Sequence, residues 1–491
     1  MSSTPPSKVI NRHGYGILKT ELSNKELHNI KKSLTVRPFV TPNTPVKPER
    51  FFVYMESPLR LWVPREWGYS KFGEPDSYRI GEGESCEKGL TFRGSLRPRQ
   101  QGIVKDWETT VIPSKRPEGR ILTVPCGYGK TVMSLWCASL VGKKTLIVVH
   151  KEFLMNQFQE EIRRFLPDAK IGKIQGSVCD TEGKDIVIGM LQSLVKKTYE
   201  PKMFDSFGMV IFDECHHLGA EVFSRVLGFL GCWRMLGLSA TPERKDRLTC
   251  VFQWYLGDYL AKITDRGKET LHVWRLTHKA TGSAEEVEEY MTEPLTVTEH
   301  VNSPKLITRV CENYSRNCLI LKIVKTLIVE QKRRVLILTD RRNQLKWLHD
   351  EYERMFPESA GYYVGGMKED ALIESAKKPL VLGTYAMASE GMNVPELNTL
   401  ILASPKSDII QSVGRILRKK AEDRVATPLV VDIIDTHPSL VRQSKKRITF
   451  YNKNKYTIMN GEWVHNKFVA SKKPSKKKEA ENKVVLCDFI D

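Results

Sequence analysis

A glycine-rich turn at residues 125–131, Pro-Cys-Gly-Tyr-Gly-Lys-Thr, has the residue types that bind a polyphosphate. The apolar stretch 120–124 precedes it and the amphipathic stretch 132–140 follows it, so we expect a strand, a loop and a helix. In that setting backbone N–H groups and the helix N-terminus face the phosphates. Lys130 would reach the β- and γ-phosphates, and the Thr131 hydroxyl would ligate Mg²⁺. Because Val124 stands where the full pattern has glycine, a plain glycine-rich turn with a surface lysine is the alternative.

Two adjacent acids, Asp213 and Glu214, follow the apolar stretch 209–212. At the end of a strand, Asp213 can hold Mg²⁺ while Glu214 orients and deprotonates the attacking water. The alternative is a strand end that carries two solvated acids. The glycine-rich turn upstream in the same expected sheet favours the catalytic interpretation.

Three further side chains suit nucleotide chemistry. The amide of Gln100 offers a donor and an acceptor to an adenine edge, which favours ATP. Arg415 and Arg418 are three residues apart, so on a helix they project from one face. Paired guanidiniums can stabilise the charge that builds on a γ-phosphate. Taken singly, Gln100 could equally belong to an ordinary helix entry, and two arginines on a solvated helix would be the favoured interpretation without the motifs of the first domain.

Apolar runs alternate with helical patterns in two parts of the chain, which predicts two α/β domains with parallel sheets. In the first we expect strands at 121–124, 145–149, 185–190, 209–212 and 235–238, with a helix at 152–165. In the second we expect strands at 335–338, 362–364, 380–382, 399–402 and 429–434, with a helix at 342–355. The expected domains are an N-terminal accessory domain at 1–95, an ATP-binding domain at 96–270, a connector at 271–315, a second α/β domain at 316–440 and a basic C-terminal extension at 441–491.

The charge balance is strongly basic. The chain has 77 Lys and Arg against 58 Asp and Glu, a net charge of +19. Lys and Arg that neutralise phosphates release counterions, so a nucleic acid is the favoured partner over a basic surface that only aids solubility. Residues 441–491 alone carry 13 Lys and Arg and 5 Asp and Glu, and 472–478 is expected to be a disordered basic tail, either a nuclear-import signal or a nucleic-acid-binding arm.

The remaining composition excludes several classes of protein. The ten cysteines include no Cys-x2-Cys pair, so no zinc site is expected. No apolar signal-peptide core follows Met1, and no run approaches about 18 apolar residues. We therefore expect an intracellular protein with reduced thiols and no membrane segment.

Six elements, in chain order, resemble the motifs of superfamily 2 helicases: Gln100, 127–131, 213–216, 239–241, 389–393 and 411–418. The resemblance covers residues 96–420. The stretch 237–246 resembles the DNA translocase of the general transcription and repair complex, and still more the helicases of large DNA viruses, including the poxvirus-type transcript-release helicase. Two positions depart from these patterns: Cys215 replaces the usual Ala, and Arg-Lys-Asp at 244–246 replaces the Arg-Glu-Asp of the translocase.

The resemblance implies two RecA-like domains in tandem and an ATP-dependent DNA helicase or duplex DNA translocase. It also implies a viral protein, active in transcription, that binds ATP and Mg²⁺ and prefers DNA to RNA as its nucleic-acid partner. The virion or the site of viral replication and transcription is its implied location, with the transcription machinery as a partner. An RNA helicase or RNA-stimulated ATPase is one alternative. A nucleic-acid-binding transcription factor with an inactive motor is another.

The resemblance also implies a role for each matching residue. The catalytic residues would be Lys130, Asp213, Glu214, Gln411, Arg415 and Arg418. ATP would contact Arg97, Gln100, Pro125, Cys126, Gly127, Tyr128, Gly129, Lys130, Thr131, Val132, Gly391 and Asn393, with Thr131 and Asp213 holding Mg²⁺. Coupling between ATP and movement would involve His216, Ser239, Ala240 and Thr241. Nucleic acid would contact His150, Lys151, Gly189, Gln192, Ser193, Thr339, Arg341 and Thr384.

Overall fold

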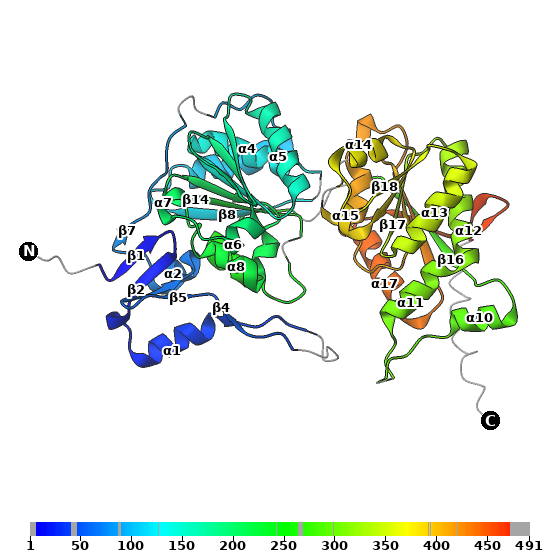
Figure 1. Ribbon diagram of the computed structural model, residues 1–491, viewed down its shortest axis with the longest axis horizontal. Helices are drawn as coiled ribbons and strands as arrows, with labels where there is room; N and C mark the ends of the chain where they lie inside the picture. The colour runs from blue at the N-terminus through cyan, green and yellow to red at the C-terminus, as the bar shows by residue number, and fades with distance from the viewer. Residues whose placement is uncertain are drawn as a thin grey trace, which may run out of the picture. The chain divides into compact units, whose positions relative to one another are not determined.

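The computed structural model divides into two units, residues 1–264 and 265–491, each built around its own large sheet (Figure 1). The structure describes residues 6–40, 47–86, 90–125, 127–241, 243–263, 269–297, 299–390, 392, 394–419 and 421–471. The expected tail at 472–478 and three expected ATP contacts, Cys126, Gly391 and Asn393, lie outside the described residues.

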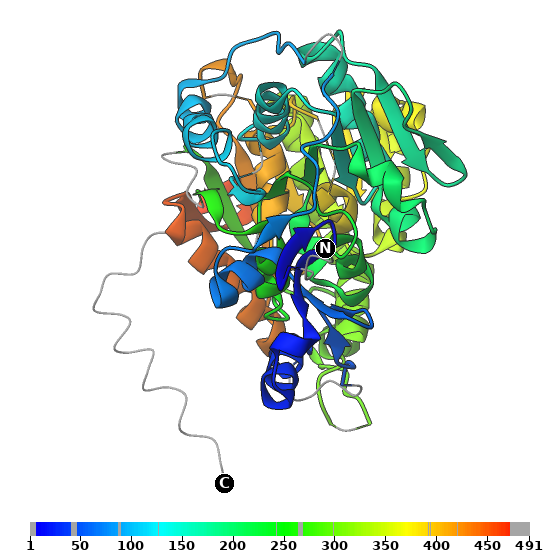
Figure 2. The same ribbon diagram turned by 90° about the vertical axis from the view of Figure 1, so that its left-hand side faces the viewer.

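The N-terminal accessory domain is a small mixed sheet with two helices, seen in blue in Figure 2. Its strands lie in the order β5 (Met55–Glu56), β6 (Arg60–Val63), β2 (Gly14–Leu18), β1 (Lys8–Asn11) and β7 (Ser77–Tyr78), with helices α1 (Asn24–Ser33) and α2 (Arg65–Phe72). Ser23 and Glu26 form a reciprocal capping box that starts α1. Tyr15, Ile17 and Leu61 are buried in the core that the sheet and helices share.

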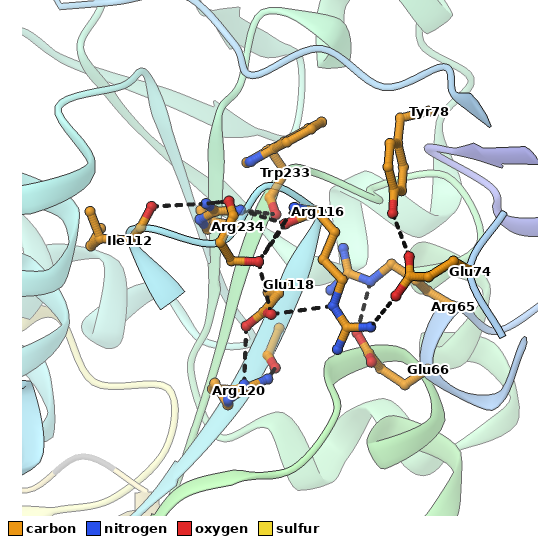
Figure 3. Close-up of polar contacts among 12 residues, drawn as sticks. Arg65, Glu66, Glu74, Tyr78, Ile112, Arg116, Glu118, Arg120, Trp233 and Arg234 are labelled. Carbon is orange, nitrogen blue, oxygen red and sulfur yellow. Dashed lines mark hydrogen bonds and ion pairs between the residues drawn. The ribbon is translucent and has the colours of Figure 1, made fainter. Parts of the chain in front are cut away.

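A cluster of charged side chains joins the accessory domain to the first α/β domain (Figure 3). Arg65 of α2 is buried and donates to the Cys232 carbonyl at 2.9 Å. Arg116 bridges Glu74 of the accessory domain, at 2.8 Å, and Glu118, at 3.3 Å. Removing Arg65 would leave the buried Cys232 carbonyl without this donor, which costs about 1 to 3 kcal/mol, whereas the exposed Arg116–Glu74 pair contributes little. The accessory domain is therefore an integral part of the first unit.

The first α/β domain contains eight strands in the order β11-β10-β12-β9-β13-β14-β8-β15. Their bounds are β8 (Glu118–Thr123), β9 (Thr145–Val149), β10 (Ile171–Gln175), β11 (Val178–Asp180), β12 (Ile186–Met190), β13 (Met209–Phe212), β14 (Arg234–Ser239) and β15 (Tyr259–Lys262). Every neighbouring pair is parallel except β10 with β11. The five expected strands are confirmed. The others were not predicted because they lie toward the sheet edges and lack a continuous apolar run.

Helices cover both faces of this sheet (Figure 1). One face carries α3 (Pro98–Asp106), α4 (Lys130–Val141) and α5 (Glu152–Phe165); the other carries α6 (Leu191–Lys196), α8 (Glu221–Leu227) and α9 (Thr249–Leu256). Successive residues of β9 alternate between the two cores, because strand side chains point to opposite faces: Ile147 packs with the first, Leu146 and Val148 with the second. Helix α5 has the predicted bounds.

The second unit contains another eight-stranded sheet, in the order β18-β19-β17-β20-β21-β16-β22-β23. Its strands are β16 (His272–His278), β17 (Val335–Thr339), β18 (Ala360–Tyr363), β19 (Leu380–Thr384), β20 (Thr399–Leu402), β21 (Leu429–Asp435), β22 (Thr457–Val464) and β23 (Lys467–Ala470). The expected strands and the helix α13 (Arg342–Met355) are confirmed. The other helices are α10 (Ala284–Met291), α11 (Ser303–Glu312), α12 (Tyr314–Lys325), α14 (Glu369–Lys377), α15 (Tyr385–Glu390), α16 (Ile410–Gly414) and α17 (Pro438–Lys453).

The second α/β domain is wider than the expected range 316–440. Strand β16 comes from the expected connector and pairs in parallel with both β21 and β22. Helix α17 and strands β22 and β23 come from the expected basic extension. These segments were assigned to a connector and an extension because polar and basic stretches flank them. The fold class, two parallel α/β domains, is confirmed. Within the described residues, no helix has the length and apolar character needed to cross a bilayer.

Candidate nucleotide site

Three of the expected motifs meet at one edge of the first sheet. Strands β13, β14 and β8 are neighbours and parallel, so their carboxyl ends share an edge. The glycine-rich loop follows β8, the acids Asp213 and Glu214 follow β13, and Thr241 lies just after β14. Ligands of parallel α/β sheets bind in loops at this edge. The structure therefore gathers the predicted phosphate, acid and coupling motifs in one place.

The loop between β8 and α4 has a backbone that requires glycine. Gly127 and Gly129 have φ angles of +78° and +89°, in the left-handed region. A Cβ at Gly129 would also lie 2.2 Å from Nε2 of Gln100. Gly129 caps the N-terminus of α4, so unpaired backbone N–H groups and the helix dipole are available to an anion there.

Gln100 forms hydrogen bonds that connect this loop to the start of α3. Its Nε2 donates to the Tyr128 carbonyl at 2.8 Å, and its Oε1 accepts from the Arg97 N–H at 2.9 Å. The side chain is only 3% exposed. The amide expected to contact adenine therefore already organises the loop and the start of α3. The adenine contact remains a prediction, with one Nε2 hydrogen left to make it.

Lys130 forms an ion pair with Glu214, with 3.1 Å between Nζ and Oε1. Both side chains are largely buried, at 12% and 16% exposure. Burial would raise the pKa of Glu214, but the charge of Lys130 and the hydrogen bond that it donates outweigh burial and lower the pKa. The Glu214 backbone is left-handed, with φ +46°, a conformation that non-glycine residues keep at functional sites. The acid is thus held ionised against the phosphate-loop lysine.

Asp213 is the second acid of this site. Burial and the neighbouring Glu214 charge raise the pKa of its carboxyl to about 6. Two carboxylates in a buried site carry more negative charge than one lysine offsets, which is an environment that favours a divalent cation. Carboxylate and hydroxyl oxygens are ligands that Mg²⁺ prefers. Asp213 and Thr131 therefore fit the expected Mg²⁺ site.

His216 connects the acid motif to the segment after β14. Its Nδ1 lies 3.0 Å from the Ser239 hydroxyl, and the Thr241 N–H donates to that same hydroxyl at 3.2 Å. Burial is the main cause of a lowered His216 pKa, so the ring is neutral near pH 7. Ser239 is fully buried, which leaves its hydroxyl dependent on these partners. The expected coupling residues thus form one hydrogen-bonded chain, apart from Ala240, whose role remains a prediction.

The nucleic-acid residues expected in the first domain also cluster, at the ends of β9 and β12. The Gln192 amide donates to the His150 carbonyl at 2.7 Å, and Ser193 accepts from the Gly176 N–H at 3.0 Å. The His150 ring is 7% exposed and lies 4.2 Å from the His217 ring, centroid to centroid. Its burial favours a structural contribution, whereas the half-buried Lys151 is more accessible. Gly189 is buried within β12.

In the second unit, the expected nucleic-acid residues lie at or just after the carboxyl ends of two adjacent strands, β17 and β19. Thr339 is fully buried and its hydroxyl accepts from the Arg341 N–H at 3.1 Å. The Arg341 guanidinium in turn donates to the Thr308 hydroxyl at 2.8 Å. Thr384 is partly exposed at the end of β19. Thr339 therefore shapes the turn, while Arg341 and Thr384 are closer to the surface.

Arg415 and Arg418 differ in their surroundings. The Arg415 guanidinium is 5% exposed and donates to the carbonyls of Ala388 and Met392, the latter at 2.8 Å. Arg418 is partly exposed, and Gln411 is too. Helix α16 ends at Gly414 and continues as a 3₁₀ turn, in which residues three apart eclipse. Arg415 therefore makes contacts within its own domain and Arg418 is the more exposed of the two, while the γ-phosphate role of both remains a prediction.

Comparisons with known proteins show the family to which the chain belongs. Residues 93–244 match the family described as type III restriction enzyme, res subunit. L396 of Acanthamoeba polyphaga mimivirus, named as a candidate ATP-dependent RNA helicase, is 34% identical over 455 residues, 91% of this chain and 86% of that protein. QP509L of African swine fever virus, with the same designation, is 25% identical over 70% of each chain. The candidate helicase 161L of Invertebrate iridescent virus 6 is 26% identical over 75% of this chain and 83% of its own. The chain belongs to the superfamily 2 helicases related to those of large DNA viruses, which are ATP-dependent enzymes.

Proposed function

We propose that this protein is a viral ATP-driven DNA helicase or duplex DNA translocase that acts in transcription. The observation that carries the motor assignment is the Lys130–Glu214 pair at the carboxyl edge of the first sheet, next to Asp213. The DNA assignment is supported by the resemblance of residues 237–246 to DNA translocases. The designations of the mimivirus and African swine fever virus relatives favour a second candidate, an RNA helicase.

The Lys130–Glu214 pair also suggests how the site works. Lys130 exchanges Glu214 for the β- and γ-phosphate oxygens when ATP binds, because both compete for one ammonium group. Losing that positive neighbour raises the pKa of Glu214, which makes it a stronger base toward the attacking water. Mg²⁺, held by Thr131 and Asp213, would neutralise charge on the phosphate oxygens. ATP would thereby activate the base that hydrolyses it.

Hydrolysis is coupled to movement through His216, Ser239 and Thr241. These three residues share hydrogen bonds, so a shift of the acid motif changes the position of the segment after β14. We assign Arg418 of the second domain to the charge that develops on the γ-phosphate. The motor steps along its track through phosphate contacts, which give little sequence specificity.

The nucleic acid that stimulates ATP hydrolysis distinguishes the DNA motor from the RNA helicase. ATP hydrolysis is expected to be stimulated more by DNA than by RNA when single-stranded DNA, duplex DNA and RNA are compared at equal nucleotide concentration. Stronger stimulation by RNA would replace the DNA proposal with the RNA helicase. A complete absence of turnover, with nucleic-acid binding intact, would instead indicate a binding protein with an inactive motor.

Helix α17 supplies a surface suited to a polyanion. Its inward face is fixed by Arg447, which is 3% exposed and pairs with Asp432 at 2.8 Å. The helix contains no acidic residue. Four cationic side chains are exposed on its outward face: Arg442, Lys445, Lys446 and Lys453. Their spacing of three, four and seven residues places them on one side of the helix.

Neutralising this face is expected to weaken nucleic-acid binding in a salt-dependent way. In the triple variant Arg442→Ala, Lys445→Ala, Lys446→Ala, the slope of log K against log salt concentration should shrink by about 2 to 3, because each lost phosphate contact removes about 0.9. The matched control is Lys322→Ala, Lys325→Ala, Lys332→Ala, which removes three exposed cations from the same unit. An equal change in both triples would show that net charge alone, and not α17, sets the slope.

A further inference from the structure

The turn between β14 and α9, residues 243–248, links the acid motif to the accessory domain. We infer that Arg244 is a positioning residue for the acid motif, and that the accessory domain sets its position through Asp246 and Arg247. The inference rests on the proposed ATPase function. It gives the accessory domain a role in hydrolysis, and it explains the Arg-Lys-Asp sequence at 244–246 through contacts within the protein.

Arg244 reaches the acid motif directly. Its Nη1 donates to the carbonyl of His216, the residue whose ring contacts Ser239. The other side of the guanidinium forms a two-pronged pair with the Asp246 carboxylate, with 2.9 Å between Nε and Oδ1. Bidentate pairs of this kind fix both the position and the plane of a guanidinium. Asp246 therefore orients the Arg244 guanidinium so that it donates to the backbone of the acid motif.

The surrounding turn leaves Arg244 little freedom. The Arg244 N–H donates to the Thr249 hydroxyl at 3.0 Å, and Asp246 Oδ1 also accepts from the Leu248 N–H at 3.1 Å. Gly219, at the end of the 3₁₀ turn that begins at Cys215, lies against the arginine. A Cβ at Gly219 would come within 2.8 Å of Cδ and Nε of Arg244. The absence of a side chain at Gly219 leaves room for the Arg244 side chain to reach the acid motif.

The accessory domain contacts the same turn through the segment that follows α1. The Phe39 N–H donates to the Asp246 carbonyl at 2.9 Å, and the Arg247 guanidinium lies 4.1 Å from the Phe39 ring centroid. Phe39 remains 45% exposed, so hydrophobic burial alone does not account for its place. The body of the domain is held by the charged cluster around Arg65 and Arg116 (Figure 3). One part of the domain is therefore anchored while another touches the turn that carries Arg244.

These contacts act on hydrolysis more than on ATP binding. Arg244 contacts the acid motif, which is expected to orient water, whereas Lys130 and the loop before α4 are expected to hold the phosphates. Weakening the turn should therefore lower kcat and leave KM for ATP nearly unchanged.

The test is a double-mutant cycle on ATP turnover in the full chain. Arg244→Gln and Asp246→Asn are each expected to lower kcat about tenfold with KM for ATP within about twofold, and the double variant should be no worse than either single one. Phe39→Ala should lower kcat about threefold in the wild type and have no effect in Arg244→Gln. The control Arg93→Gln breaks an exposed ion pair with Asp168, 2.8 Å long, and should change neither constant.

Hydrogen exchange of the backbone amides at 213–219 provides a readout that does not require turnover. Faster exchange there in Asp246→Asn and Phe39→Ala, with an unchanged melting temperature, would support the inference even if the wild type hydrolyses no ATP. Wild-type exchange and kcat in Arg244→Gln would overturn it. A Phe39→Ala effect that persists in the Arg244→Gln background, or a loss of kcat matched by a loss of melting temperature, would also overturn it.

Discussion

Glu214→Gln is expected to lower kcat for ATP hydrolysis by about 10²- to 10⁴-fold, the range that one general base contributes. The substitution keeps the shape of the side chain and removes only its ability to accept a proton. Glu214 is paired with Lys130 at 3.1 Å and kept ionised by it, so the wild-type acid is ready to act as a base. Steady-state ATP turnover measures the effect, and nucleic-acid affinity should remain within about twofold because the phosphate-contacting surfaces are unchanged.

The matched control for this prediction is Glu221→Gln. Glu221 is an acid of the same domain, half exposed and paired with Arg225 one helical turn away. Its replacement should leave kcat unchanged, since exposed ion pairs contribute little. Hydrolysis by Glu214→Gln at the wild-type rate would remove Glu214 from the mechanism and with it the catalytic interpretation of the acid motif.

Lys130→Ala is expected to lower kcat/KM for ATP by at least about 10²- to 10³-fold, the effect of removing one preorganised group that stabilises developing charge. The loss arises because the phosphates lose their cation. The pKa of Glu214 also rises because its strongest positive neighbour is gone, which strengthens the base but does not replace that cation. Binding of a fluorescent ATP analogue should weaken in parallel, which separates this variant from Glu214→Gln, where ATP binding is retained.

Lys184→Ala is the control for the lysine substitution. Lys184 forms a partly exposed pair with Asp180 on the same unit, so its removal subtracts the same charge without touching the site. ATP binding and turnover should match the wild type. If Lys130→Ala binds and hydrolyses ATP as well as Lys184→Ala does, the loop at 125–131 is a structural turn and the alternative stated for it from the sequence is correct.

Long apolar or amphipathic segments were predictable from sequence because their periodicity is local. Helices α5 and α13 have the expected bounds, and the strands of both sheet centres lie where continuous apolar runs occur. The assembly of the site was also predictable in outline. Residues that follow adjacent parallel strands must meet at one edge, so Lys130 and Glu214 were expected to lie together.

Contacts that depend on distant backbone carbonyls were not predictable. Arg415 is predicted from its spacing to Arg418 to contact the γ-phosphate, which remains a prediction; the sequence did not predict its hydrogen bonds to the carbonyls of Ala388 and Met392. Gln100 was assigned to adenine, yet its amide holds the Tyr128 carbonyl. The type of a residue determines which groups its side chain can hydrogen-bond to, but which carbonyl lies within reach depends on the tertiary fold.

Strand β16 was missed for a related reason. It lies far along the chain from β21 and β22, between which it is inserted, and only that insertion explains its place. The sequence 272–278 also mixes polar and apolar residues without a regular period, unlike the continuous apolar runs of the other central strands. Its pairing depends on segments at both ends of the second unit, which no local pattern reveals.

We propose that the acids and lysine at the edge of the first sheet form an ATPase that nucleic acid controls. The most direct test is the steady-state rate of ATP hydrolysis by the full chain, measured with and without saturating nucleic acid. Glu214→Gln serves as the inactive control. We predict that at least one of single-stranded DNA, duplex DNA and RNA raises the wild-type rate about tenfold or more, and that none raises the rate of the variant. A wild-type rate that no polymer changes, or equal rates in the two proteins, would contradict it.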